Sequence, residues 1–211
     1  MSKLLILARH GNTFKAEDKP VWVGARSDLP LVEKGLEQAH LLAGSLFKAQ
    51  IAPEIILAGP LQRTRITAQI VAESLQMPPS KLRIDARLTE IDYGTWEGKS
   101  TEAIIAMGAE KQLNDWNTKS IVPQNANWKP SEEKISSDIH MLLEEISQGT
   151  SLIITSNGIL RFFARAASNV RTLPNLKVLP GNGCIMTYDG TVWAIKAWNL
   201  PPDLLMREIP T

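Results

Sequence analysis

The residues best suited to chemistry in this sequence follow a short apolar stretch near its start. Residues 4–8 read Leu-Leu-Ile-Leu-Ala and are followed directly by Arg9, His10 and Gly11. An unbroken apolar run of this length is typical of a strand that is buried on both faces of a parallel sheet. Ligands bind beyond the carboxyl ends of such strands, so the triplet is placed for binding or catalysis. A turn that merely carries one histidine would give the same pattern.

A second turn of this kind follows the apolar run at residues 55–58. The next residues predict a helix over about 62–75, and Arg63 and Arg65 fall in its first turn. Positive charges at a helix N-terminus oppose the helix dipole, and an anion bound there would relieve the mismatch. Two solvent-exposed arginines are the alternative that the sequence leaves open.

Two further segments carry polar residues where loops are expected. A third apolar run, residues 152–155, ends in a turn that contains Asn157 and Gly158. Residues 88–98 hold two glycines, two aromatic residues and three acids, among them Glu90. This composition is typical of an ordered loop. The sequence thus places candidate functional groups on four separate loops.

The elements that must position these loops alternate between strand and helix. Strand, turn and helix in this order indicate an α/β fold, which we expect to be a three-layer sandwich with a mostly parallel central sheet and helices on both faces. We expect residues 1–211 to form one domain, with an irregular cap or substrate lid around 108–130. Apolar spacing and turn residues predict further helices over about 33–48, 101–107 and 131–146, one ending near 167, and a hairpin at Asp189-Gly190.

Net charge, cysteine content and the length of the apolar runs limit the binding partners and the cellular compartment that we expect for this chain. The formal net charge of +1 gives no reason to expect nucleic acid or an anionic membrane surface as a partner. The single cysteine, Cys184, excludes an internal disulfide and favours a reducing compartment, where we expect it to be a buried, inert thiol. The sequence shows no signal-peptide pattern and no apolar run long enough to span a bilayer. Together these features predict a cytoplasmic protein.

Taken in order, four segments resemble the histidine phosphatase superfamily, the group that includes phosphoglycerate mutases and many phosphomonoesterases. The resemblance extends over nearly the whole chain and implies a phosphoglycerate mutase-like fold. The four segments are Arg9-His10-Gly11, Gly59-Pro60-Leu61-Gln62-Arg63, residues 88–98 and Thr155-Ser156-Asn157-Gly158.

The resemblance implies a role for each of these groups. His10 matches the family's nucleophile, which attacks phosphorus through one ring nitrogen while the other donates a hydrogen bond. Arg9 and Arg63 would hold the phosphoryl oxygens with planar guanidinium groups. Glu90 matches the family's proton donor. Neither a metal ion nor an organic cofactor is implied.

The turn at Asn157 departs from the family pattern, which has a second histidine there. Asparagine keeps a hydrogen-bond donor but carries no charge, and charged hydrogen bonds are worth about 1.5–3 kcal/mol against about 1 kcal/mol for neutral ones. We therefore expect Asn157 to take part in catalysis at a rate lowered by roughly one power of ten. Further phosphate or substrate contacts are expected from Asn12, Thr13, Arg26 and Gly158.

The function that follows is a phosphomonoesterase acting on a small phosphorylated metabolite through a phosphohistidine on His10. Asn157 leaves open a second class, a phosphoester-binding or regulatory protein that has lost turnover. A phosphoglycerate mutase-type transfer is a lesser alternative, because the family's mutases tend to carry a longer insertion than residues 108–130. No sequence feature specifies an oligomeric state.

Overall fold

A six-stranded sheet forms the centre of the molecule. The computed structural model describes residues 3–147 and 149–209, and its strands lie in the order β3-β2-β4-β1-β5-β6. The first four strands along this order are parallel, whereas β5 and β6 form an antiparallel hairpin at one edge. The strands are β1 (Lys3–Arg9), β2 (Ile55–Ala58), β3 (Leu82–Ile84), β4 (Gly149–Thr155), β5 (Gly183–Tyr188) and β6 (Trp193–Leu200).

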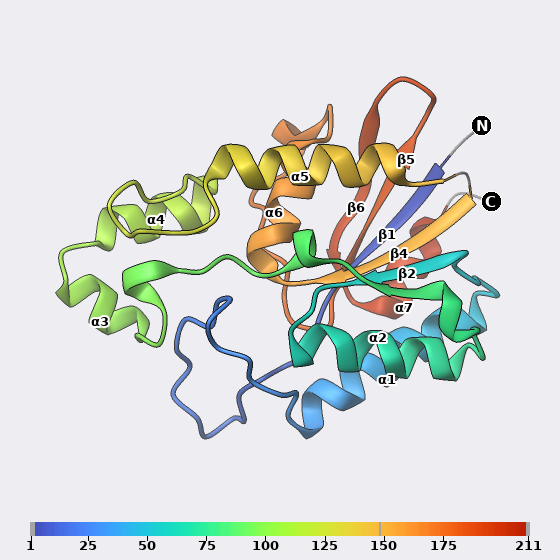
Figure 1. The fold of residues 1–211 in the computed structure, drawn as a ribbon, viewed down its shortest axis with the longest axis horizontal. Coiled ribbons are helices and arrows are strands. Elements are labelled where there is room, and N and C mark those ends of the chain that lie inside the picture. Colours follow the sequence, from blue (N-terminus) through green and yellow to red (C-terminus); the bar gives the residue numbers. More distant parts are fainter. Residues whose placement is uncertain (1–2, 148, 210–211) are drawn as a thin grey trace.

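Helices cover both faces of this sheet (Figure 1). On one face lie α1 (Glu33–Lys48), α2 (Gln62–Ser74) and the short α7 (Pro202–Leu205), and on the other lie α5 (Glu132–Glu145) and α6 (Asn157–Arg165). The predicted three-layer α/β sandwich is therefore confirmed. Among the described residues, none of the helices combines the length and apolarity needed to cross a bilayer. Short 3-10 turns occur at Pro79–Lys81, Ala86–Leu88, Gly94–Trp96, Val170–Thr172 and Met206–Glu208.

The apolar character of β1 follows from its position between the two helical layers. Leu5 and Leu7 belong to the core under α5 and α6, whereas Ile6 and Ala8 belong to the core under α1 and α2. Side chains alternate between the faces of a strand, so a strand that is covered twice needs apolar residues at every position. Cys184 on β5 is buried as predicted, and burial raises the pKa of its thiol far above the usual value.

The carboxyl ends of the parallel strands lie next to one another and form the carboxyl edge of the sheet, which is distinct from the side occupied by the β5–β6 hairpin. Arg9 pairs with Thr155, and Ala58 pairs with Ile154. The backbone N–H of His10 extends the ladder by donating to the Thr155 carbonyl over 3.1 Å. The turns that follow β1, β2 and β4 are therefore brought together, as their positions in the sequence predicted.

Residues 101–119 form a helical extension beyond this edge, at the end of the molecule opposite the two termini (Figure 1). It contains α3 (Thr101–Ala106) and α4 (Glu110–Lys119). The prediction of an irregular segment over 108–130 is wrong for α4. Its apolar stripe is weak, and Asp115 forms ion pairs with Lys111 and Lys119 one turn to either side, at 2.6 and 2.9 Å.

An aromatic cluster joins this extension to the rest of the molecule. Five rings, from Trp22, Tyr93, Trp96, Trp116 and Trp128, meet mostly edge to face with centroids 4.8–6.1 Å apart. Such contacts contribute about 0.5–1.5 kcal/mol each beyond the area they bury. The cluster therefore fixes α4 and the loop at 88–98 against the segment that follows His10.

The glycine of the Arg9–Gly11 triplet allows α1 to approach closely. A Cβ on Gly11 would lie 2.3 Å from the carbonyl oxygen of Gly35, and a Cβ on Gly35 would lie 2.2 Å from the carbonyl oxygen of Asn12. Both contacts are with backbone, which cannot move aside without shifting the start of α1. The two glycines therefore set the path of the chain immediately after His10.

Candidate active site

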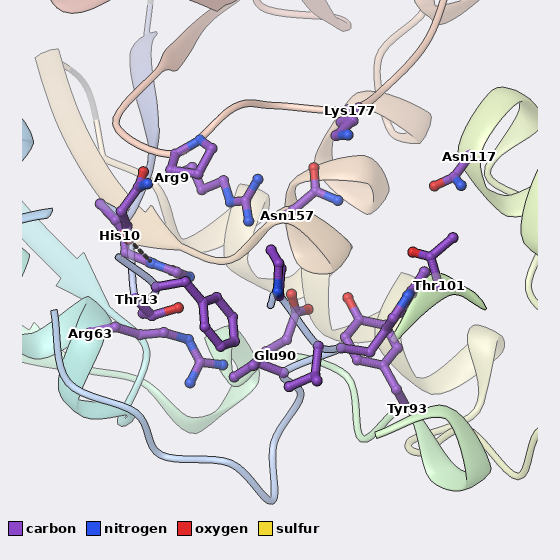
Figure 2. A pocket seen from close by; sticks show the side chains of 18 of the residues that line it. Arg9, His10, Thr13, Arg63, Glu90, Tyr93, Thr101, Asn117, Asn157 and Lys177 are labelled. Carbon is purple, nitrogen blue, oxygen red and sulfur yellow. Dashed lines mark hydrogen bonds between the residues drawn. The ribbon is translucent and has the colours of Figure 1, made fainter. Parts of the chain in front are cut away.

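A cavity of about 450 Å³ opens where the parallel strands end (Figure 2). It brings together seven of the residues that were proposed from the sequence. They come from four segments: the end of β1 with the turn that follows it, the first turn of α2, the loop at 88–98 and the first turn of α6. The seven are Arg9, His10, Asn12, Thr13, Arg63, Glu90 and Asn157.

His10 is held in one tautomer. Its side chain is buried, and Nδ1 lies 2.7 Å from the carbonyl oxygen of Gly11. A carbonyl oxygen can only accept, so Nδ1 carries the hydrogen and Nε2 keeps its lone pair. Because His10 lines the cavity, this lone pair is available to a bound ligand.

The surroundings keep the His10 ring neutral. Burial lowers the pKa of His10 well below its usual value, and the charges of Arg9 and Arg63 lower it further. The hydrogen bond to the Gly11 carbonyl acts in the opposite direction but is the weakest of these influences. A neutral imidazole at pH 7 is the form that can act as a nucleophile.

Two guanidinium groups next to His10 are held by backbone carbonyl oxygens. Arg9 Nη1 donates to the Val178 carbonyl over 2.7 Å, and its Nε has no hydrogen-bond partner within the described part of the chain. Arg63, which is almost fully buried, donates from Nη1 to the Ser27 carbonyl and from Nη2 to the Gly24 carbonyl, over 2.7 and 3.1 Å. Carbonyl oxygens orient a guanidinium without neutralising it, so both charges remain available to an anion.

Glu90, on the loop at 88–98, faces His10 and the two guanidinium groups (Figure 2). Its Oε1 accepts from the Ile91 N–H over 2.9 Å, and its Oε2 accepts from the Gly158 N–H over 3.1 Å. The loop is attached to the sheet edge because the Thr155 hydroxyl donates to the Leu88 carbonyl. The carboxylate is therefore fixed by backbone donors on two different elements.

Gly158 supports this arrangement without lining the cavity. A Cβ at this position would lie 2.4 Å from Oε1 of Glu90 and 2.8 Å from the hydroxyl oxygen of Tyr93. Only glycine lets α6 come this close to the carboxylate. Its backbone N–H is used by Glu90, so the structure gives Gly158 a positioning contact in place of the expected contact with phosphate.

Asn157 occupies the start of α6, with its side chain at the cavity. Its Oδ1 accepts from the Val178 N–H over 2.8 Å, which fixes the amide and directs Nδ2 away from that contact. The Val178 carbonyl at the same time accepts from Arg9. One residue of an irregular segment therefore orients both Asn157 and Arg9.

Arg26 does not line the cavity, and the expectation of a phosphate or substrate contact is not met. Its Nε lies 3.0 Å from Asp92 Oδ1 and 3.4 Å from Glu97 Oε2. These two carboxylates of the loop at 88–98 attract Arg26 away from the strand ends. Glu97 also accepts from the Ser27 hydroxyl, so the ion pairs brace the loop whose carbonyls hold Arg63.

Several lining residues were not proposed as site residues from the sequence. Tyr93 is buried beside Glu90, and burial raises the pKa of its hydroxyl well above the usual value. Arg161 lies one helical turn after Asn157, a spacing that places both side chains on one face of α6. That spacing was the available signal for Arg161. Other polar residues that line the cavity include Thr101, Asn117 and Lys177.

Trp22 and Trp116 also line the cavity, and Trp128 packs against both of these rings. A family model described as "Histidine phosphatase superfamily (branch 1)" matches residues 5–201. The chain belongs to this superfamily. The resemblance seen in the four sequence segments is confirmed.

Relatives within the superfamily carry the name of a mutase. A 2,3-bisphosphoglycerate-dependent phosphoglycerate mutase from a Methylobacterium species is 27% identical over 193 residues, which cover 86% of this chain and 89% of the relative. The corresponding mutase from Bartonella bacilliformis is 30% identical over 126 residues, 59% of this chain, and the match spans only 60% of that relative's length.

Several solved structures share the fold of this chain, although their sequence identity to it is low. A phosphoglycerate mutase from Bacillus anthracis superposes with a TM-score of 0.78 at 17% identity, covering 98% of this chain and 96% of the other. A mycobacterial glucosyl-3-phosphoglycerate phosphatase superposes with a TM-score of 0.73 at 21% identity, covering 94% and 99%. Both comparisons show that the fold is phosphoglycerate mutase-like.

The pKa of His10 provides a direct test of this electrostatic environment. We expect the His10 ring, followed by nuclear magnetic resonance and assigned with His10→Gln, to keep its neutral Nδ1–H form at pH values below the usual histidine pKa of 6.5. As the pH falls, His10 binds a proton in the unfolded chain at a higher pH than it does in the folded protein. The contribution of His10 should therefore lower the free energy of unfolding as the pH falls below 6.5. A His10 midpoint at or above 6.5 would contradict the described environment.

Proposed function

We propose that this protein is a phosphomonoesterase that transfers the phosphoryl group of a small phosphorylated substrate to His10 and then to water. The observation that carries the proposal is the arrangement around His10. A neutral imidazole presents Nε2 to a cavity in which two guanidinium groups lie beside it. Glu90 supplies a carboxyl group in the same cavity.

In the first step Nε2 of His10 attacks phosphorus, and the bond from phosphorus to the ester oxygen breaks. Negative charge on the transferred oxygens is stabilised by Arg9 and Arg63, whose forked N–H groups match phosphoryl geometry. Glu90 gives its proton to the departing ester oxygen, so that an alcohol leaves. The His10 ring then carries a positive charge, which the Gly11 carbonyl stabilises through Nδ1–H.

In the second step water attacks the phosphohistidine and regenerates the enzyme. Glu90 takes a proton from the attacking water, the bond from phosphorus to Nε2 breaks, and inorganic phosphate leaves. The same carboxyl group thus serves as acid and then as base. The backbone N–H groups of Ile91 and Gly158 hold it in place throughout.

Asn12 and Thr13 complete the proposed phosphoryl pocket from the turn after β1. Both line the cavity. The backbone N–H of Asn12 is already donated to Gln38 Oε1 over 2.8 Å, which leaves the Asn12 side chain and the Thr13 hydroxyl as the groups that can donate to phosphate. Residues 108–130 are proposed as a cap, since Trp116 and Asn117 of α4 form the far wall of the cavity.

Structural neighbours support a phosphatase. Structures of the mycobacterial glucosyl-3-phosphoglycerate phosphatase were solved with VO3 and with inorganic phosphate, at TM-scores of 0.75 and 0.74 to this chain. A further neighbour is named as a putative alpha-ribazole-5'-P phosphatase from Escherichia coli, with a TM-score of 0.71. These names suggest that a small phosphorylated molecule is the ligand here as well.

Asn157 favours a second candidate, a phosphoester-binding protein with impaired turnover. We interpret Asn157 as standing in place of the family's second histidine, so that a neutral amide faces the phosphoryl group. The names of the sequence relatives favour a third candidate, phosphoglycerate mutase-type transfer. Interconversion of 2- and 3-phosphoglycerate faster than release of inorganic phosphate would support the mutase.

Hydrolysis of p-nitrophenyl phosphate tests the main proposal. We expect turnover by the unmodified protein that is unchanged by EDTA, and a loss of at least about a thousandfold in His10→Ala, because the nucleophile is removed. His40→Ala is the matched control, since His40 is exposed on α1 and distant in sequence from every proposed group. Turnover that survives in His10→Ala, with its circular dichroism spectrum unchanged, would refute the role of His10.

The substitution Asn157→His tests the cost of the neutral amide. We expect kcat for p-nitrophenyl phosphate to rise by about tenfold, which is the difference between a charged and a neutral hydrogen bond expressed as a rate. Asn117→His, at the opposite wall of the cavity, should leave kcat within about twofold. An unchanged or lower kcat in Asn157→His would show that the pocket is built around the amide itself.

A further inference from the structure

Arg161 is a buried cation that the proposed phosphoryl transfer does not use. It lies on α6, only 1% of its surface is exposed, and it lines the cavity. Its Nη1 donates to the Trp116 carbonyl over 2.6 Å and to the Ser120 hydroxyl over 2.8 Å. The guanidinium also lies 4.5 Å from the centre of the Trp116 ring. All of these contacts are with neutral groups of the α4 segment.

The hydrogen-bonding capacity of Arg161 is not satisfied by the protein. Its Nε is buried and has no partner in the described ranges, and among these residues no carboxylate lies within ion-pair distance of its guanidinium. Burial lowers the pKa of Arg161 to about 10, so the side chain is still charged at pH 7. Leaving a buried charge without a counterion is costly, which points to a partner that arrives through the cavity.

The charges that line the cavity support the same conclusion. Five described lining residues are cationic, namely Arg9, Lys15, Arg63, Arg161 and Lys177, whereas Glu90 is the one carboxylate among them. The whole chain has a formal net charge of only +1, so this excess is local to the cavity. A phosphoryl dianion held by Arg9 and Arg63 would still leave an excess of two positive charges among these lining residues.

The charged and polar side chains that line the cavity gather at two different ends of it. Arg9, His10, Thr13 and Arg63 gather at one end, whereas Lys177 and Asn117 lie at the other, with Asn157 between (Figure 2). Arg161 belongs to the second end because it contacts Trp116, the neighbour of Asn117 on α4.

We propose that Arg161, with Lys177 at the rim, binds a second anionic group on the substrate, a carboxylate or a further phosphoryl group remote from the phosphate that is transferred. The proposal rests on the proposed function, because it takes the end near His10 as the phosphoryl pocket. With Nη1 already engaged, Arg161 offers the edge formed by Nε and Nη2, and two parallel N–H groups match two oxygens of either anion. The substrate class is thus a phosphomonoester that carries a second negative charge.

Binding of phosphonates by calorimetry tests this proposal without requiring turnover, because the C–P bond is not an ester bond. The ligands are propylphosphonate, 3-phosphonopropanoate and propane-1,3-bisphosphonate, with their four- to six-carbon homologues. We expect at least one chain length of the carboxylate or the bisphosphonate to bind about tenfold more tightly than the alkylphosphonate of equal length. The better of the two charged series identifies the second group.

Substitutions assign this preference to Arg161. Arg161→Lys keeps the charge but removes the fork, and we expect the preference to fall to about threefold or less while propylphosphonate affinity stays unchanged. Arg165→Lys is the matched control, because Arg165 lies one turn further along α6, is exposed and pairs with Glu132. If Arg161→Lys fails to fold, Lys177→Ala replaces it, since Lys177 is exposed and should also reduce the preference.

Equal affinity for charged and uncharged ligands at every chain length would overturn the proposal, as would an equal loss for all ligands in a folded Arg161→Lys. Failure of all phosphonates to bind would overturn it together with the phosphoryl pocket. A clear preference for the second anion without any hydrolysis of p-nitrophenyl phosphate would refute the phosphatase and leave the Arg161 site standing.

Discussion

The site depends on burying positive charge around an imidazole that must stay neutral. Arg63 and Arg161 are almost fully buried, and burial lowers the pKa of Arg9, Arg63 and Arg161 alike. Taking a charge out of water is expensive unless other groups replace the lost hydrogen bonds. Here backbone carbonyls and one hydroxyl replace some of these hydrogen bonds, and we propose that a ligand anion supplies the rest. Burial, followed by the charges of Arg9 and Arg63, lowers the pKa of His10 and so keeps the ring unprotonated, as the proposed nucleophile must be.

This constraint explains why irregular segments matter as much as the sheet. Parallel strands bring His10, the first turn of α2 and Asn157 to one edge. The carbonyls that hold Arg9 and Arg63, however, belong to Gly24, Ser27 and Val178, which lie outside helices and strands. The Arg26 ion pairs and the contacts of Trp22 with the aromatic cluster fix the segment that carries Gly24 and Ser27. Loops thereby gain the rigidity that a preorganised site requires.

The sequence predicted those helices and strands whose apolar residues recur at a regular spacing. The runs at 55–58 and 33–48 became β2 and α1 with the predicted bounds, because their apolar residues face cores that are continuous. The strand β3 was missed because it has three residues, two of them exposed. Helix α4 was missed because its apolar stripe is weak, with Leu113 and Trp116 as its buried apolar residues. Arg26 was misplaced since its partners, Asp92 and Glu97, are distant in sequence, and the role of Val178 had no local signal at all.

Direct detection of the phosphoryl group on His10 tests the central claim most closely. The protein is mixed with an excess of p-nitrophenyl phosphate, quenched in alkali, in which phosphohistidine survives, and digested for mass spectrometry. The account predicts one phosphoryl group on the peptide that contains His10, more of it in Glu90→Gln, in which water is no longer activated, and none in His10→Ala. Hydrolysis without a phosphorylated intermediate, or with the phosphoryl group on another residue, would contradict the account.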